Sequence, residues 1–380
     1  MPTAVTLARF AATGTVEPSA PPRTLPTSGR STVPPVAPDV PAARPGAPRA
    51  SAPVVLALDV GGTSVKGAVV DAAGDVVARR SAPTGGGPTD PDGATTAVLA
   101  VVRELWAAVP GAQHVVAIGV VTPGVVDEDG GVVRSAENLG WRELPLRALV
   151  EDAVGVPVGF GHDARAAGLA EWRLGAGRGA GDHAFLSVGT GIAAALVLGD
   201  RVYAGGGWAG EIGHGGATTG DLCACGGRGC VETYASAAGI ARQYTARTGV
   251  EVDGARGVLV RAQAGDAVAG QVWQRAVDGL ADLVAGLVRT LGLRTVVVGG
   301  GLVLAGDALL GPLDAAVRAR LTVHPAPELR AARLGAEAGT FGAALLAWNA
   351  SGQTVPPGLD VRGRPSGRRI APDAGAGSRH

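Results

Sequence analysis

The most distinctive chemical motif of this 380-residue chain is a group of three cysteines near a histidine. Cys223, Cys225 and Cys230 are its only cysteines, their spacing is C-x-C-x4-C, and His214 lies nine residues upstream. Three thiolates and one imidazole form a tetrahedral ligand set of the kind that holds structural Zn²⁺. Inert buried thiols are the alternative, whereas an odd count and no sign of an oxidising compartment disfavour a disulfide. The sequence therefore predicts a zinc loop within residues 209–232.

Two strand–turn–strand segments are candidates for binding phosphate. The apolar run 54–60 ends at a Gly-Gly-Thr turn, residues 61–63, and a second apolar strand ends at a Gly-Thr-Gly turn, residues 189–191. Glycine lets backbone N–H groups approach a phosphate, and Asp59 can face a Mg²⁺ ion on the same phosphates. Plain hairpins are the alternative. A third glycine turn, residues 299–301, can admit a flat or charged ligand. The repeated pattern predicts an internal duplication whose two turns hold a phosphate chain between two lobes.

Asp163 lies where a strand is expected to meet a helix. The strand ends at Gly161, His162 and Asp163 form the junction, and helical spacing starts at Ala164. Backbone N–H groups and the helix dipole favour an ionised carboxylate near a helix N-terminus. A carboxylate at the end of a strand is a candidate general base, and a plain capping aspartate is the alternative.

Composition and charge exclude several function classes. Basic and acidic residues number 33 each, so no global field would recruit nucleic acid or an acidic membrane. No apolar run reaches the roughly 18 residues of a transmembrane helix. Residues 1–52 are rich in Pro and Ala and lack the apolar core of a signal peptide, so we expect a disordered extension and a cytoplasmic location. Residues 351–380 are expected to form a second disordered tail.

Strand and helix patterns alternate between these termini, as in an α/β protein. Apolar spacing predicts helices over 95–108, 267–291 and 334–348, and a strand over 115–121. The segment 137–146 is polar and irregular, and it is expected either to rim a cleft or to connect two elements.

These motifs occur together and in order in one known family. DVGGTSVKGAVVD, the Asp163 junction, SVGTGI, GEIGH with CACGGRGCVE, and VVVGGG resemble the ROK family of bacterial sugar kinases and sugar-responsive repressors, over about residues 54–350. The resemblance implies a two-domain actin-like ATPase (ribonuclease-H-like) α/β fold with an interdomain cleft and a zinc-binding loop. It places residues 53–165, joined by the C-terminal helix 338–350, in a small domain, and residues 166–337 in a large one.

The resemblance also implies an activity, ATP-dependent phosphorylation of a hexose, with glucose as the first expectation. Asp163 becomes the general base that accepts the proton of the sugar 6-hydroxyl, and the cofactors are Mg²⁺ and structural Zn²⁺. The implied metal ligands are His214, Cys223, Cys225 and Cys230. The implied sugar contacts are His162, Asp163, Glu211, His214 and Glu232, to which Asn138 of the polar segment is added. The implied ATP contacts are Asp59, Gly61, Gly62, Thr63, Gly189, Thr190, Gly191, Gly299, Gly300 and Gly301.

Two departures from the family pattern leave the sugar open. His162 and Arg165 stand where the family usually has Asn in Asn-Asp-Ala-Asn, and residues 193–195 are alanines where glycine is usual. Kinases for fructose, mannose, N-acetylmannosamine or N-acetylglucosamine are alternatives, with polyphosphate as an alternative donor. A non-catalytic sugar-binding regulator is another, although about 50 N-terminal residues are too few for a winged helix-turn-helix. The expected partners are sugar and ATP, without nucleic acid or membrane, in a homodimer or homotetramer.

Overall fold

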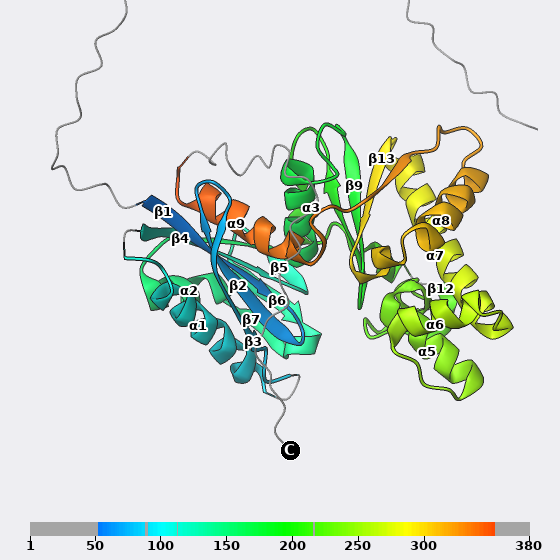
Figure 1. The fold of residues 1–380 in the computed structure, drawn as a ribbon, viewed down its shortest axis with the longest axis horizontal. Helices are drawn as coiled ribbons and strands as arrows, with labels where there is room; N and C mark the ends of the chain where they lie inside the picture. Colours follow the sequence, from blue (N-terminus) through cyan, green and yellow to red (C-terminus); the bar gives the residue numbers. More distant parts are fainter. Residues whose placement is uncertain (1–51, 88–89, 112, 216, 354–380) are drawn as a thin grey trace, which may run out of the picture. The chain divides into compact units, whose positions relative to one another are not determined.

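The computed structural model describes residues 52–87, 90–111, 113–215 and 217–353 (Figure 1). Ala52 already belongs to the first strand, and residues 351–353 form a turn after the last helix, so the predicted terminal extensions are wrong at these boundary residues. The rest of both predicted extensions lies outside the described residues. Within the described part of the chain, no helix combines the length and apolar character that a membrane crossing requires.

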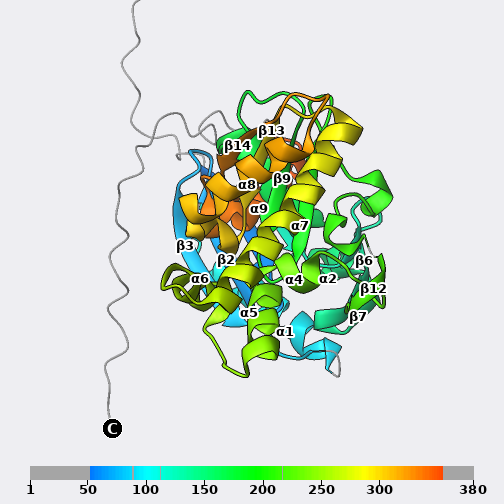
Figure 2. The ribbon, with the colours of Figure 1, turned by 90° about the vertical axis from the view of Figure 1, so that its right-hand side faces the viewer.

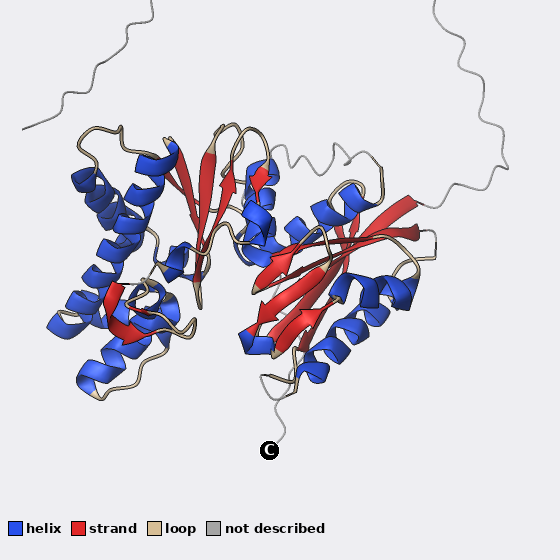
Figure 3. Ribbon diagram, turned by 180° about the vertical axis from the view of Figure 1, so that it is seen from behind, coloured by secondary structure: helices blue, strands red, loops and turns tan. Residues whose placement is uncertain are grey.

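Five strands form the first sheet, in the order β3-β2-β1-β4-β8 (Figure 3). β1 and β2 form the predicted antiparallel hairpin, with Val60 opposite Val65 across the Gly-Gly-Thr turn. β4 pairs in parallel with β1, and β8 pairs in parallel with β4. The bounds are β1 Ala52–Val60, β2 Ser64–Asp71, β3 Val76–Pro83, β4 Gln113–Thr122 and β8 Val158–His162.

The second sheet repeats this topology in the order β11-β10-β9-β13-β14. β9 and β10 form the second predicted hairpin, with Val188 opposite Ile192, and β13 runs parallel to β9. In both sheets the strands follow the order third, second, first, fourth, fifth, which confirms the predicted internal repetition. The bounds are β9 His183–Val188, β10 Ile192–Val197, β11 Val202–Tyr203, β13 Thr295–Gly299 and β14 Glu328–Ala331.

β1 is buried on both faces, as its continuous apolar run predicts. Leu56 and Leu58 belong to the core that α1 and α2 complete, whereas Val55 and Ala57 face α3 and α9. Asp59, near the end of this strand, is therefore held by packing on both sides of the sheet. The helix bounds are α1 Pro91–Ala107, α2 Leu146–Val154, α3 Asp163–Leu174 and α9 Ala338–Ala350.

Helices α7 and α8 cover one face of the second sheet (Figure 2). α7 spans Ala267–Leu291, the predicted range, because Asp266 caps its first N–H groups and Gly292 ends it in a left-handed conformation. α3 packs against both β10 and α9. The predicted division into two domains at residues 165 and 166 stays a prediction. The remaining elements include β12 Ala217–Leu222, α4 Glu232–Ala235, α5 Ala237–Thr248, α6 Gly254–Gln263 and α8 Asp307–Arg320.

Three sequence-based expectations about elements are wrong. The segment 137–146 is not irregular, because it contains a short 3-10 helix and strand β7 of a three-stranded sheet, and Trp141 is buried with its indole N–H on the carbonyl of Pro91. α1 begins at Pro91 because Asp90 accepts a hydrogen bond from the Gly93 N–H. α9 begins after a 3-10 turn and not at residue 334. The bounds of the small sheet are β5 Val125–Asp127, β6 Val132–Ala136 and β7 Trp141–Leu144.

Glycines let α9 lie directly on the first sheet. A Cβ on Gly119 of β4 would lie 1.8 Å from the carbonyl oxygen of Ala343, which is backbone and cannot turn aside. We expect Gly119→Ala to lower the free energy of unfolding by about 3 kcal/mol, because the helix must move away from the sheet. Urea denaturation measures this. Gly270→Ala is the matched control: its Cβ would meet no atom within 4 Å, so it should leave stability unchanged or raise it. An equal loss in both variants would contradict the account of this packing.

Candidate functional site

The three cysteines and His214 converge on one point. Each offers one ligand atom, and these four atoms all lie within 4.8 Å of one another. The sulfurs of Cys225 and Cys230 are 3.7 Å apart, and the sulfur of Cys223 is 3.5 Å from Nδ1 of His214. A tetrahedral zinc site with ordinary bond lengths has S···S edges of about 3.8 Å and S···N edges of about 3.6 Å. Two edges of the cluster therefore match those of a tetrahedral metal ion, and its other ligand atoms lie within 4.8 Å of them.

A short backbone turn brings the ligands of this cluster together. The Cys223 N–H donates to the carbonyl of Gly227, and the Gly226 N–H donates to the carbonyl of Cys223. Gly226 has φ +85°, which explains why glycine stands inside the loop. Cys230 directly precedes the turn into α4. These hydrogen bonds hold residues 223–227 in a tight turn that brings Cys223 and Cys225 together.

His214 connects the cysteine cluster to Glu232. Its Nδ1 faces the sulfur of Cys223, and its Nε2 lies 3.7 Å from Oε2 of Glu232. The same Oε2 accepts the N–H of Ile192 at 2.8 Å. A Cβ on Gly191 would lie 2.6 Å from that oxygen, so any larger residue there would displace the Glu232 carboxylate. Glu232 therefore joins the cysteine loop to the Gly-Thr-Gly turn at the end of β9.

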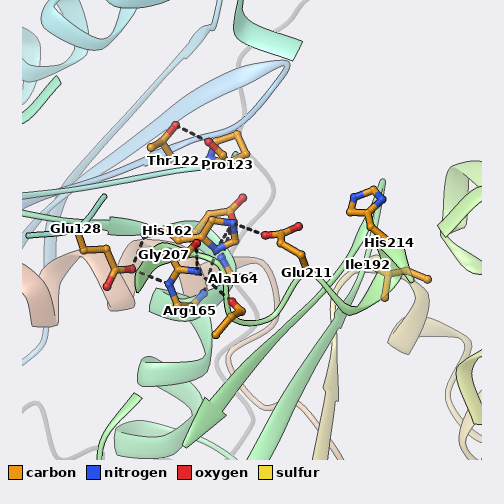
Figure 4. Close-up of polar contacts among 12 residues, drawn as sticks. Thr122, Pro123, Glu128, His162, Ala164, Arg165, Ile192, Gly207, Glu211 and His214 are labelled. Carbon is orange, nitrogen blue, oxygen red and sulfur yellow. Dashed lines mark hydrogen bonds and ion pairs between the residues drawn. The ribbon is translucent and has the colours of Figure 1, made fainter. Parts of the chain in front are cut away.

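A second polar group contains His162 and Glu211 (Figure 4). Nε2 of His162 lies 3.6 Å from Oε1 of Glu211. Burial, helped by the charge of Arg165, lowers the pKa of His162 to about 4, so this imidazole is neutral at pH 7. Its Nδ1 accepts the Arg165 N–H at 3.5 Å as the cap of α3. The ring proton is therefore on Nε2, which points toward Glu211.

Asp163 is the first residue of α3, and its side chain is 36% exposed. Desolvation raises the pKa of Asp163, while the hydrogen bond from the Ala164 N–H and the charge of Arg165 act in the opposite direction. The expected effect of the helix N-terminus is present as the hydrogen bond from Ala164, but desolvation outweighs it. His162 takes the capping position, and Asp163 is the first residue within the helix. A carboxylate with a raised pKa accepts a proton more readily.

The negative charge of Asp163 acts on Asp59 at the end of the first sheet. The pKa of Asp59 is raised to about 6, first by burial and then by the negative charge of Asp163. Two carboxylates in such a relation favour a shared cation or a shared proton. Asp59 also lies against Gly339 near the start of α9, where a Cβ would be 2.5 Å from its Oδ2.

The first glycine turn is fixed by hydrogen bonds to Thr84, and two of its residues are exposed to solvent. The Thr84 hydroxyl donates to the Gly61 carbonyl at 2.6 Å, and the Thr84 N–H donates to the Thr63 carbonyl. Thr84 is buried, whereas Gly62 and Thr63 are exposed. Asn138, also exposed, lies against Gly62, where a Cβ would be 2.6 Å from its Nδ2. Gly62, Thr63 and the side-chain amide of Asn138 are therefore exposed side by side at this turn.

The second and third glycine turns lie at the same edge of the second sheet. Gly300 has φ +78°, and a Cβ there would lie 2.4 Å from the carbonyl oxygen of Val188, which directly precedes the Gly-Thr-Gly turn. Parallel pairing of β13 with β9 brings this about. The Gly-Gly-Thr turn belongs to the first sheet. Two of the three predicted nucleotide-binding turns are therefore neighbours in the second sheet, and the third belongs to the first sheet.

Replacing Asp59 with Asn should stabilise the fold. A raised carboxyl pKa means that the folded protein binds the proton more tightly than the unfolded chain, so this stability is present below about pH 4 and is lost as pH rises through about 6. Asp59→Asn removes that loss, and we expect about 2 kcal/mol of added stability at pH 7 and little at pH 4, without added Mg²⁺. Thermal unfolding at both pH values measures it. Asp92→Asn, in the first turn of α1, should change neither value. A gain that does not grow with pH would contradict the assignment.

Residues 55–350 of the chain match the ROK family. The chain is 34% identical over 317 residues to a glucokinase of Halalkalibacterium halodurans, covering 77% of this chain and 94% of that protein. It is 35% identical over 299 residues to an N-acetylmannosamine kinase of Shigella flexneri, covering 77% of this chain and 98% of that one. The crystal structure of a ROK family glucokinase from Streptomyces griseus in complex with glucose and AMPPNP matches at a TM-score of 0.68 and 31% identity, over 78% of this chain and 99% of that one. The extent of these matches, together with the duplicated α/β architecture, shows that this chain belongs to the ROK family and has its sugar-kinase fold.

Proposed function

We propose that this chain is an ATP-dependent hexose kinase that converts glucose to glucose 6-phosphate. The observation that carries the proposal is Asp163, a partly exposed carboxylate of raised pKa that lies beside the His162–Glu211 pair. The similarity to glucokinases, one of them solved with glucose and AMPPNP, supports the reaction class and the first substrate.

In the proposed mechanism, Asp163 accepts the proton of the sugar 6-hydroxyl as that oxygen attacks the γ-phosphorus of ATP. Phosphoryl transfer depends mainly on positioning and charge stabilisation, so one oriented base is sufficient protein chemistry. Neutral His162 donates a hydrogen bond from Nε2, and Glu211 beside it accepts one, so the pair can hold neighbouring sugar hydroxyls. His214 and Glu232 form the second proposed hydroxyl-binding pair.

The phosphates of ATP would lie against the Gly-Gly-Thr and Gly-Thr-Gly turns, with the adenosine near residues 299–301. Exposure of Gly62, Thr63 and Thr190 supports this, because a phosphate can approach exposed turn residues. Asp59 is the proposed residue for Mg²⁺, and its pKa of about 6 reflects a carboxylate that lacks a positive partner strong enough to offset its burial. Bound Mg²⁺ would offset the negative charge of the phosphates and of both aspartates.

Zinc is the proposed occupant of the cysteine–histidine cluster. The supporting observations are the ligand set and edge lengths close to those of a tetrahedral zinc site. Zinc at Nδ1 of His214 would keep the proton on Nε2 and fix its direction toward Glu232. The metal would thus order the sugar-binding side chains without taking part in bond breaking.

N-acetylmannosamine is the second candidate substrate, favoured by the 35% identity to the Shigella flexneri kinase. Polyphosphate as donor, a non-catalytic sugar-binding role, a homodimer or homotetramer, and a cytoplasmic location stay predictions.

A coupled assay across hexoses and N-acetylhexosamines tests the proposal. Glucose should show the highest kcat/KM with ATP, and production of glucose 6-phosphate can be followed by reduction of NADP in the presence of its dehydrogenase. Preferential turnover of N-acetylmannosamine would replace the substrate but keep the reaction. No ATP-dependent turnover of any sugar by zinc-loaded protein would overturn the proposal.

A further inference from the structure

A buried arginine connects three parts of the proposed sugar site (Figure 4). Arg165, on the first turn of α3, is only 2% exposed. Its Nε donates to Oε1 of Glu128 at 2.7 Å. Its Nη1 donates to the backbone carbonyls of Gly207 at 3.3 Å and Ala209 at 3.1 Å. The planar guanidinium thus holds a carboxylate from the loop after β5 and two carbonyls of the segment before Glu211 in one fixed arrangement.

The same network fixes His162 from two sides. Oε1 of Glu128 accepts the His162 N–H at 3.2 Å in addition to the Arg165 side chain. The backbone N–H of Arg165 donates to Nδ1 of the imidazole. The position of the His162 backbone therefore depends on the Glu128–Arg165 pair, whereas the tautomer of its ring depends on the Arg165 backbone N–H, which a side-chain substitution retains.

The segment that leads to Glu211 is supported by its own backbone hydrogen bonds, such as those from Gly207 and Ala209 to the carbonyl of Ala204, but by few side chains. Gly205, Gly206 and Gly207 have φ values of +55°, +65° and +94°, and they carry no side chains that could pack. The next residue, Trp208, is 67% exposed. The Ala194 N–H donates to the Gly210 carbonyl, next to Glu211. Arg165 binds the carbonyls of Gly207 and Ala209, which come before Glu211 in the same segment.

We propose that Arg165 is a positioning residue that sets the spacing between His162 and Glu211 and thereby the affinity for the sugar. The inference rests on the proposed function for the identity of the ligand, but it concerns binding and not phosphoryl transfer. A purely structural buried ion pair is the competing explanation. It predicts a loss of stability without a selective loss of sugar affinity.

The test compares Arg165→Met with wild type. Methionine keeps an unbranched apolar stem and removes all side-chain hydrogen-bond donors, while the backbone N–H to His162 remains. Calorimetry should show a Kd for glucose, or for the preferred hexose of the assay, raised by about 30-fold, because a displaced Glu211 loses charge-assisted hydrogen bonds to sugar hydroxyls. The Kd for the ATP analogue AMPPNP should stay within twofold. Arg318→Met is the matched control, since Arg318 is exposed on α8 and pairs with Asp314.

Arg165→Lys provides a second variant should the methionine variant fail to fold. Lysine keeps one charged donor for Glu128 but lacks the fork that reaches the two carbonyls, so its Kd should lie between those of wild type and Arg165→Met. A folded Arg165 variant with unchanged sugar affinity, or one that weakens sugar and AMPPNP equally, overturns the inference. Calorimetry separates this result from a failure of the proposed function, because binding is measured whether or not the sugar is phosphorylated.

Discussion

Asp163→Asn is expected to lower kcat for hexose phosphorylation by about 10³-fold, within the range that removal of a general base produces. Asparagine matches the volume of aspartate and can still accept the Ala164 N–H, so the first turn of α3 should be retained. It cannot accept the proton of the attacking hydroxyl at neutral pH. The sugar hydroxyl must then attack without a general base to accept its proton. Steady-state kinetics with ATP and the preferred hexose measure the loss.

Binding measurements separate this catalytic role from a structural one. The Kd for the hexose should change by less than about fivefold in Asp163→Asn, since an amide can still hydrogen-bond a hydroxyl. Asp152→Asn, an exposed replacement of the same kind on α2, should leave kcat unchanged. A kcat within threefold of wild type in Asp163→Asn would show that another group accepts the proton.

Loss of the metal is expected to have the second large effect. Cys230→Ser removes a buried ligand of the proposed zinc site, and we expect zinc content to fall from about one ion per chain to below about 0.2. Without the ion, His214 is free to rotate and no longer presents Nε2 to Glu232. We therefore expect the kcat/KM for the hexose to fall by about 100-fold, the size of effect seen when orienting contacts of metal ligands are lost.

Metal analysis by mass spectrometry and the same kinetic assay check both parts of this prediction. Thr219→Ala, an exposed replacement on the neighbouring strand β12, should retain zinc and activity. The melting temperature should also fall in Cys230→Ser, because binding of the ion stabilises only the folded loop. A zinc-free protein with wild-type sugar affinity would contradict the proposed role of the cluster.

The parts of this protein that the sequence predicts well depend on local chemistry. The two hairpins follow from an apolar strand that meets glycine, and the bounds of α7 follow from a capping aspartate and a terminal glycine. The cysteine–histidine cluster is predicted for the same reason, since its four ligands lie within 17 consecutive residues, 214–230.

The parts that sequence reasoning missed depend on contacts between distant residues. Trp141 reads as part of a polar loop, but its indole reaches Pro91, 50 residues away. Glu128 gave no signal beyond its charge, although it holds both Arg165 and His162. Glu171 is fully buried and accepts N–H groups from Arg333 and Leu334, more than 160 residues away. The available signal for Glu171 is a charged residue among the alanines and glycine that follow Ala164.

The direction of the Asp163 pKa shows the same limit at the site itself. Its place at the start of a helix predicts an easily ionised carboxylate, and that local effect is present as the hydrogen bond from Ala164. Burial by the rest of the fold acts in the opposite direction and dominates. Local sequence can name the candidate base, but its proton affinity depends on tertiary packing.

The most direct test of the central claim is a crystal structure of the zinc-loaded chain with glucose and AMPPNP, measured also at the zinc absorption edge. The account predicts the glucose 6-hydroxyl within about 3 Å of a carboxylate oxygen of Asp163. It also predicts a single anomalous peak at the centre of His214, Cys223, Cys225 and Cys230. Glucose bound away from Asp163, or the absence of the zinc peak, would contradict it.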